Sequence, residues 1–186
     1  MKNLKIKIAI SGAAQTSPCA SDVLEKCLIL GRTIAKNNCI LITGATTGVP
    51  YWVAKGAKQE GGFVIGLSPA LSFKDHVEKF NLPIDYHDII IWTGLDYSGR
   101  NMILSRSAEG IIFVCGRIGT LNEFTTAFED RKIMGVLVGS GGTEPLIKEI
   151  LERAKREERI IIWEEDPEKL VYKLIEKIKE NEPIFS

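Results

Sequence analysis

The stretch GIIFVCGRIGTLNEF, residues 110–124, joins an apolar run to a glycine-rich turn and then to the beginning of a helical pattern. Residues 110–114 are all nonpolar, which is typical of a strand that is covered on both faces of a parallel sheet. A buried strand, a short glycine-rich turn and a helix form the repeating unit of α/β proteins. This stretch therefore predicts an α/β fold.

The same alternation extends over the whole chain. We expect strands near residues 5–11, 39–43, 62–67, 88–92, 110–114, 133–138 and 159–163. We expect helices near residues 19–37, 50–60, 99–107, 120–130, 144–156 and 167–180. Right-handed crossovers then predict one Rossmann-like domain, residues 1–186, with a doubly wound and mainly parallel sheet of about seven strands between two helical layers. Residues 68–87 form the longest irregular connection, which is typical of a binding loop or lid.

Composition excludes several classes of protein. The 186 residues are 45% hydrophobic and 26% charged, and their formal net charge is +0. This balance gives no reason to expect nucleic acid as a partner. The apolar runs are too short to span a membrane, and the first strand begins too early for a signal peptide to be visible. We therefore expect a cytoplasmic protein with no membrane partner.

The cysteines and histidines do not have the spacing of a metal site. Cys19, Cys27, Cys39 and Cys115 contain no C-x-x-C pair, and no histidine lies at ligand spacing from them. We expect buried or half-buried thiols in a reducing compartment, and no metal. The Lys- and Glu-rich segment 149–182 is typical of solvent-facing helices.

Ligands of doubly wound folds bind beyond the carboxyl ends of the strands, which directs attention to the turns that follow them. Four of these turns are rich in Gly, Ser and Thr: SGAAQTSP (11–18), TGATTGVP (43–50), TGLDYSGRN (93–101) and CGRIGTLNE (115–123). The first lacks G-x-G-x-x-G, and no turn contains G-x-x-x-x-G-K-[ST], so neither a dinucleotide cofactor nor P-loop hydrolysis is predicted. Backbone N–H groups at a helix start can nevertheless bind phosphate.

The turn TLNE, residues 120–123, has two interpretations. Thr120 at an N-cap and Glu123 three residues later would form a capping box, with Gly116 and Gly119 permitting the turn. Alternatively, open N–H groups near Gly119 would receive an anion, with Arg117 adding positive charge and Glu123 facing the ligand. The motif by itself leaves both interpretations open.

Arg100 gives a second indication. We expect this residue at the start of the helix that follows the fourth strand, where a cation opposes the helix dipole. An anionic ligand or a carboxylate from the next turn would explain its position. Arg106 follows about two turns later, not far from the same face of the helix. A plain surface position is the alternative for each arginine.

The run from Arg100 to Glu123 resembles the signature of the Lonely Guy family of phosphoribohydrolases, in which an arginine opens one helix and a P-G-G-x-G-T-x-x-E turn follows the next strand. TGLDYSGRNMIL and SAEGIIFVCGRIGTLNEFTTAF are still more similar to a sister branch described as molybdenum cofactor carriers. The resemblance covers about residues 5–165 and implies a Rossmann-like fold, a phosphorylated small molecule as ligand, no resident cofactor and a homodimer, to which residues 123–130 could contribute.

The resemblance also implies roles for particular residues. Glu123 and Arg100 would be catalytic, with Glu123 stabilising the cationic sugar as an N-glycosidic bond breaks. The phosphate and nucleotide would be bound by Gly12, Ala13, Gly44, Thr46, Thr47, Gly48, Arg106, Gly116, Arg117, Ile118, Gly119 and Thr120.

Two departures from the pattern leave the activity open. Arg117 replaces a glycine of the family turn, and GATTGVP replaces a triple glycine. The sequence therefore supports two functions: hydrolysis of a nucleoside 5′-monophosphate to a base and ribose 5-phosphate, or a non-catalytic carrier or sensor of a phosphorylated ligand such as the molybdenum cofactor. Binding of single-stranded DNA is disfavoured, because the chain has no basic stripe rich in aromatic residues.

Overall fold

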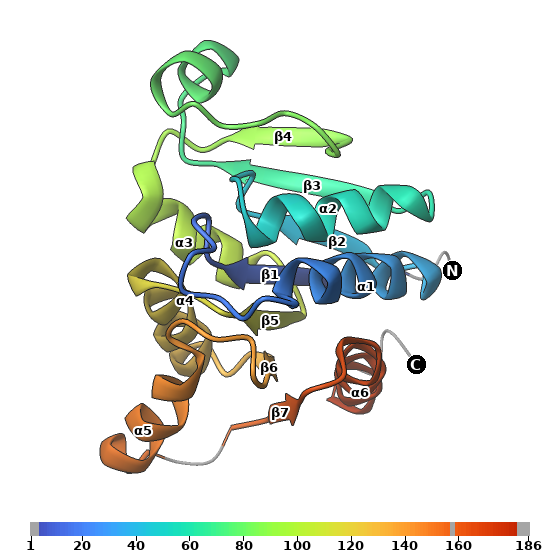
Figure 1. Ribbon diagram of the computed structural model, residues 1–186, viewed down its shortest axis with the longest axis vertical. Helices are drawn as coiled ribbons and strands as arrows, with labels where there is room; N and C mark the ends of the chain where they lie inside the picture. Colours follow the sequence, from blue (N-terminus) through green and yellow to red (C-terminus); the bar gives the residue numbers. More distant parts are fainter. Residues whose placement is uncertain (1–3, 157–158, 182–186) are drawn as a thin grey trace.

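The computed structural model describes residues 4–156 and 159–181 as an α/β fold in three layers (Figure 1). The strands are β1 (Lys7–Gly12), β2 (Ile40–Thr43), β3 (Phe63–Ser68), β4 (Ile89–Trp92), β5 (Gly110–Val114), β6 (Ile133–Leu137) and β7 (Ile161–Glu164). The α-helices are α1 (Val23–Lys36), α2 (Val49–Gln59), α3 (Asp96–Arg106), α4 (Ile118–Glu129), α5 (Glu144–Ala154) and α6 (Pro167–Asn181).

All seven strands lie parallel in one sheet, in the order β4-β3-β2-β1-β5-β6-β7. The chain builds outward from β1 to β4, and α3 then carries it back so that β5 pairs with the other side of β1. The strand order thus reverses between β1 and β5, which is where folds of this type bind ligands. The predicted fold class and the predicted number of strands are confirmed.

Two apolar cores fill the spaces between the sheet and its helices. One core includes Leu30 of α1, Val53 of α2 and Leu174 of α6. The other core, on the opposite face, includes Leu104 of α3 and Phe124 of α4. The central strands β5 and β6 are buried along their whole length, because helices cover both of their faces.

Three helix starts differ from the sequence-based expectation. The first helix begins at Val23 rather than at residue 19, because Cys19 is held in the preceding loop by a disulfide. The third begins at Asp96 and the fourth at Ile118, so both start earlier than expected. Arg100 therefore lies in the second turn of α3, and not at its N-terminus. The segment 68–87 is also more ordered than expected, since Asp75–Lys79 form a short π-helix.

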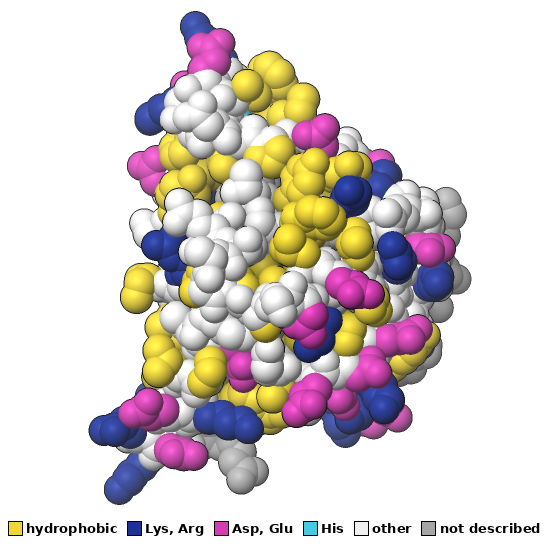
Figure 2. Space-filling view, in the orientation of Figure 1, with side chains coloured by type: hydrophobic (Ala, Val, Ile, Leu, Met, Phe, Trp, Pro, Cys, Tyr) yellow, Lys and Arg dark blue, Asp and Glu magenta, His cyan; other side chains and the backbone are white. Residues whose placement is uncertain are grey.

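The helices and the surface bear on the expectations about membrane and nucleic-acid partners. Among residues 4–156 and 159–181, no helix is long and apolar enough to cross a membrane. Charged side chains of both signs are interspersed on the face shown in Figure 2, with no large area of one sign. The surface on this side has no single-sign field of the kind that attracts nucleic acid.

Candidate functional site

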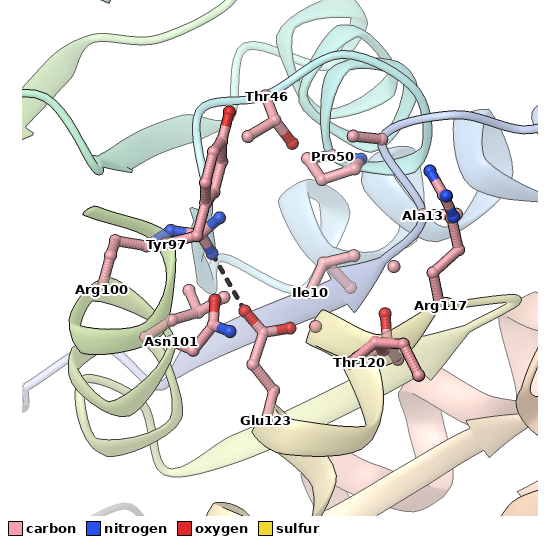
Figure 3. Close-up of a pocket in the computed structure, with 16 residues that line it drawn as sticks. Ile10, Ala13, Thr46, Pro50, Tyr97, Arg100, Asn101, Arg117, Thr120 and Glu123 are labelled. Carbon is pink, nitrogen blue, oxygen red and sulfur yellow. Dashed lines mark hydrogen bonds and ion pairs between the residues drawn. The ribbon is translucent and has the colours of Figure 1, made fainter. Parts of the chain in front are cut away.

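A pocket of about 310 Å³ opens at the carboxyl edge of the sheet, at the point where the strand order reverses (Figure 3). Its walls come from the ends of β1 and β2, from α3, and from the first turns of α4. Ten of its lining residues were predicted from the sequence: Gly12, Ala13, Gly44, Thr46, Arg100, Arg117, Ile118, Gly119, Thr120 and Glu123. The volume is at the lower end of the range that holds small-molecule ligands.

A buried ion pair forms the floor of the pocket. Arg100 Nη1 donates a hydrogen bond to Glu123 Oε1 at 2.9 Å, and both side chains are almost fully buried. Ser11, at the end of β1, donates a hydrogen bond to the other carboxylate oxygen of Glu123. The pair therefore joins α3, α4 and β1 at one point. Removing one member would leave a buried charge uncompensated.

Burial governs the titration of both members of the pair. It raises the pKa of the Glu123 carboxyl above its ordinary value, although Arg100 and Ser11 favour the ionised form. Burial also lowers the pKa of Arg100, and the attraction of Glu123 opposes this change. Arginine nevertheless keeps its proton at neutral pH, because its ordinary pKa is so high. The floor of the pocket thus carries a fixed positive charge beside a carboxyl that is harder to ionise than usual.

One donor of the buried guanidinium has no partner. Arg100 Nε is shielded from solvent and makes no hydrogen bond within the described chain. Leaving a buried donor unsatisfied costs about 1–3 kcal/mol, and such groups in native structures need an explanation. A ligand acceptor, reached by a small rotation of the side chain, would supply the missing bond. This orphaned donor is the strongest local indication of an anionic ligand.

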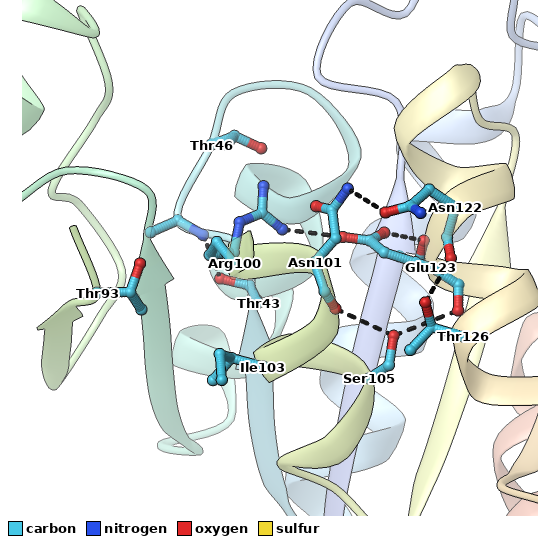
Figure 4. A network of polar contacts seen from close by, with 12 residues as sticks. Thr43, Thr46, Thr93, Arg100, Asn101, Ile103, Ser105, Asn122, Glu123 and Thr126 are labelled. Atoms are coloured by element: carbon cyan, nitrogen blue, oxygen red, sulfur yellow. Dashed lines mark hydrogen bonds and ion pairs between the residues drawn. The ribbon is translucent and has the colours of Figure 1, made fainter. Parts of the chain in front are cut away.

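Hydrogen bonds behind the pocket hold α3 against α4 (Figure 4). Ser105 Oγ donates to the carbonyl oxygens of Asn101 at 3.1 Å and Glu123 at 3.2 Å. In one orientation of its amide, Asn101 Nδ2 donates to Asn122 Oδ1 at 3.1 Å; in the other, it donates to Glu123 Oε1 and to the Tyr97 carbonyl, both at 2.9 Å. Glu123 receives hydrogen bonds from Ser11 and Arg100, and these two bonds fix its orientation.

The first turn of α4 forms another wall of the pocket. Arg117 is the N-cap residue, and the helix begins with Ile118, Gly119 and Thr120. Their N–H groups precede the first intrahelical hydrogen bonds and give the helix start its partial positive charge. The predicted capping box is wrong, because Thr120 lies inside the helix rather than at its N-cap. Thr120 is instead available to line the pocket, and Glu123 to bind Arg100.

Backbone geometry before α4 makes this arrangement possible. Gly116 has a φ of +114°, a conformation that side chains rarely adopt, and a Cβ there would lie 2.7 Å from Thr120 Cγ2. At the pocket mouth the exposed Arg117 reaches the loop that follows β1, where its Nη1 donates to Gln15 Oε1 at 2.5 Å. Arg117 lines the rim and adds positive charge without filling the floor.

Four predicted site residues are not in the pocket lining: Thr47, Gly48, Arg106 and Gly116. Thr47 and Gly48 support the wall instead: Thr47 Oγ1 donates to the Ala14 carbonyl at 3.0 Å, and a Cβ on Gly48 would lie 2.3 Å from the Ala13 oxygen. Gly116 shapes the turn before α4. These residues therefore lie beside the pocket lining rather than in it.

The expectation that Arg106 lies near the same face of the helix as Arg100 is wrong. Arg106, at the end of α3, donates from Nε to Asp130 Oδ2 at 2.7 Å on the outer surface. It points away from the pocket because six positions on a helix correspond to about 1.7 turns, which places the two residues on different faces. Arg106 is therefore useful as a control for Arg100.

Sequence reasoning missed the pocket residues Ile10, Ala14, Pro50, Tyr97, Asn101 and Leu104. The Tyr97 ring lies 6.0 Å from the Arg100 guanidinium and offers an aromatic face at the mouth. Its spacing three residues before Arg100 would have placed it on the same helix face, had the start of α3 been predicted correctly.

The expectation that all four cysteines are thiols is correct for two of them and wrong for the other two. Cys27 and Cys39 are free and buried, and burial raises their pKa values to about 12 and about 11. Cys19 and Cys115, however, form a disulfide across 96 residues of sequence. A linear sequence does not show which loops meet, so this pairing could not be foreseen. No cluster of potential metal ligands occurs among the residues that the structure describes.

Comparison with known proteins places the chain in a family. The model of the SLOG cluster4 family matches residues 5–171, which include every element that lines the pocket. The chain belongs to the SLOG cluster4 family. This membership and the structural neighbours confirm the resemblance to the superfamily of Lonely Guy and molybdenum cofactor carrier proteins.

Three solved structures are similar to this SLOG cluster4 protein over nearly its whole length. TM1055, a structural genomics target, is 28% identical with a TM-score of 0.78, covering 94% of this chain and 99% of its own. The molybdenum cofactor binding protein of Rippkaea orientalis is 27% identical with a TM-score of 0.76, covering 94% and 98%. The molybdenum cofactor carrier protein of Chlamydomonas reinhardtii is 26% identical with a TM-score of 0.74, covering 95% and 99%.

Proposed function

We propose that this SLOG cluster4 protein binds a phosphorylated small molecule, with a nucleotide-like or pterin-like ring system, in the pocket between β1, α3 and α4. The observation that carries the proposal is the guanidinium of Arg100, which is buried in the pocket floor with an unpartnered Nε. The start of α4 adds N–H donors that suit a phosphate. Tyr97 offers a face against which a flat ring can stack.

Paired ligands test the role of the phosphate. Titration calorimetry with 5′-AMP and with adenosine compares two molecules that differ only in the phosphate group. We expect 5′-AMP to bind measurably more tightly than adenosine, and we expect Arg100→Lys to weaken that preference. Arg106→Ala, on the same helix but outside the pocket, is the matched control. Equal binding of both ligands would contradict the proposal.

The similarity to two molybdenum cofactor proteins favours a carrier. Both are molybdenum cofactor proteins, and each aligns with nearly the whole of this chain. The hydrogen bonds from Ser11 and Arg100 occupy both oxygens of the Glu123 carboxylate, which suits a positioning role better than attack on a substrate. We therefore infer a non-catalytic carrier or sensor that retains its ligand. Mass spectrometry of molecules that copurify with the native protein tests this inference.

Hydrolysis of a nucleoside 5′-monophosphate is the second candidate. It is favoured by the position of Glu123, whose carboxylate lines the pocket next to Arg100. Water would add to C1′ of the ribose while the bond to the base nitrogen breaks, the base would leave with a proton, and ionised Glu123 would stabilise the cationic sugar.

Chromatography of free base separates the two candidates. For a hydrolase, wild-type protein releases adenine from 5′-AMP and Glu123→Gln releases none while still binding the nucleotide. Normal binding without any release of base from a panel of nucleotides supports the carrier and excludes hydrolysis of those nucleotides.

We also propose that the protein forms a homodimer in the cytoplasm. A shallow groove on the outer faces of α3 and α4, lined in part by Met102, Thr125 and Glu129, is the candidate pairing surface. Within the segment 123–130, the apolar residues Phe124, Ala127 and Phe128 are already buried in the core. Light scattering tests the mass, and Thr125→Arg should shift a dimer towards the monomer.

A further inference from the structure

The disulfide connects two of the segments that form the pocket. Cys115 directly follows β5 and lies at the beginning of the turn that leads into α4. Cys19 lies in the loop between β1 and α1, a few residues after Ala13 and Ala14, which line the pocket. The bond therefore holds the loop after β1 against the turn before α4, next to the anion-binding wall.

Few other contacts hold this loop. The Ala20 N–H donates to the Ser140 carbonyl at 3.0 Å, and the Gly142 N–H donates to the Pro18 carbonyl at 2.9 Å. The exposed contact between Arg117 and Gln15 crosses the pocket mouth. These contacts are weak beside a covalent bond, because exposed and partly exposed hydrogen bonds contribute little net free energy.

The earlier part of the loop is anchored separately. Val49 N donates to the Ala13 carbonyl at 2.9 Å, and Thr47 Oγ1 donates to the Ala14 carbonyl at 3.0 Å. These bonds fasten residues 13–14 to the start of α2 whether or not the disulfide is present. Loss of the disulfide would thus loosen residues 15–20 in particular. The turn before α4 stays anchored, because Cys115 N donates to Ser140 Oγ at 2.7 Å and Thr143 N donates to the Gly116 carbonyl at 3.1 Å.

The four cysteines differ in their access to a reductant. Cys27 and Cys39 are buried thiols with raised pKa values, which makes them poor nucleophiles. Cys115 is fully buried, whereas Cys19 is partly exposed. An incoming thiolate would therefore reach the sulfur of Cys19 first.

We propose that the Cys19–Cys115 bond is a redox latch of the ligand pocket, operated by a small dithiol or a dithiol protein. One thiolate of the reductant attacks Cys19 Sγ, the bond to Cys115 breaks, and Cys115 leaves as a thiolate and takes up a proton. The second thiol of the reductant then attacks the reductant sulfur that is now bonded to Cys19. This step releases Cys19 as a thiol. The reductant ends as a disulfide, and two electrons and two protons have moved to the protein.

The latch acts on ligand retention, and in this respect it rests on the proposed function. In the oxidised protein, the loop after β1 and the start of α4 form a preorganised wall, which lowers the cost of binding. In the reduced protein, residues 15–20 move away from Arg117 and the ligand leaves more readily. We expect reduction to weaken the binding of 5′-AMP by about tenfold, a size typical of couplings between two sites.

Hydrogen exchange tests the latch without requiring a ligand. Full-length protein is compared before and after treatment with dithiothreitol, and the free thiols are counted in denaturant. The count should rise from two to all four cysteines. We expect faster exchange confined to residues 15–20. Unchanged exchange there, faster exchange throughout the sheet, or four thiols that persist after treatment with oxidised dithiothreitol would each overturn the proposal.

Binding of 5′-AMP to both forms separates the latch from the proposed function. Binding to neither form counts against the proposed function, while the exchange data still decide the latch. Equal affinity of the two forms counts against the latch and leaves the function intact. The double variant Cys19→Ser with Cys115→Ser is the matched control: it should behave like the reduced protein and show no further response to dithiothreitol.

Discussion

Gly44 lies directly against the guanidinium of Arg100, so that the absence of one side chain makes room for another. A Cβ at position 44 would lie 2.5 Å from Arg100 Nη1 and 2.7 Å from its Cζ. Such a contact is too short to exist without movement. The end of β2 therefore sets the position of the cation that α3 contributes to the pocket floor, and it does so without any hydrogen bond.

Gly44→Ala should displace the guanidinium and disturb its bond to Glu123. We expect a loss of about 1–3 kcal/mol in the free energy of unfolding, as for other overpacked sites, together with weaker binding of 5′-AMP. Chemical denaturation measures the first effect and calorimetry the second. Gly119→Ala is the matched control for stability: the nearest atom to its Cβ would be 3.8 Å away. Unfolding of the two variants at the same denaturant concentration would contradict this account.

Arg100→Ala should be much more damaging than Arg106→Ala. The first leaves the buried carboxylate of Glu123 without its ion pair, which typically costs about 3–5 kcal/mol. The second removes an exposed pair with Asp130, which is expected to have little effect on stability because solvent screens it. Denaturation curves of the two variants test the difference. If Arg100→Ala does not fold, Arg100→Lys should still be less stable than Arg106→Ala. Comparable losses from both helix positions would show that the buried pair has no special role.

Glu123 should make stability decrease as the pH rises. Because burial raises its pKa in the folded state, the folded protein holds this proton more tightly than the unfolded chain does. The contribution of Glu123 to stability is therefore fully present below its ordinary pKa of 4.5. It is lost as the pH rises through the higher pKa of the folded state. Glu123→Gln should remove this dependence from the denaturation midpoints measured across that window. An identical pH slope in the variant would be evidence against the raised pKa.

Glu164 should behave in the opposite way. Lys173 lies 2.5 Å from its carboxylate, and this hydrogen bond and ion pair, with N–H donors from the following turn, lower the pKa of Glu164 to about 2. The contribution of Glu164 to stability is present above its ordinary pKa of 4.5 and is lost as the pH falls towards 2. Lys173→Met should flatten the acid limb of the stability curve. If the limb keeps its shape, the pair does not form in solution.

The sequence predicted the features that depend on local pattern. Apolar runs such as residues 110–114 identified the buried strands, and the glycine-rich turns identified the edge of the sheet where the pocket forms. Arg100 and Glu123 were both named, and they meet in the pocket floor. These successes follow from the alternation of strands and helices, which brings the turns to one edge.

The features that the sequence missed depend on exact helix starts or on distant contacts. Thr120 was expected at the N-cap, but α4 begins two residues earlier than expected. Arg106 was expected near the same face of α3 as Arg100, but it lies on another face and binds Asp130. The Cys19–Cys115 bond needs the loop after β1 to meet the end of β5, which only the folded topology determines. Helix boundaries are the least certain part of such predictions, and in this protein they decide which side chains face the ligand.

Diffraction from crystals soaked in 5′-AMP tests the central claim most directly. We expect a phosphate within hydrogen-bonding distance, about 3 Å, of the N–H groups of Ile118, Gly119 or Thr120. We also expect the guanidinium of Arg100 to turn and bind the same molecule. A pocket that stays empty at saturating nucleotide, or a nucleotide bound elsewhere while Arg100 remains unchanged, would contradict this claim.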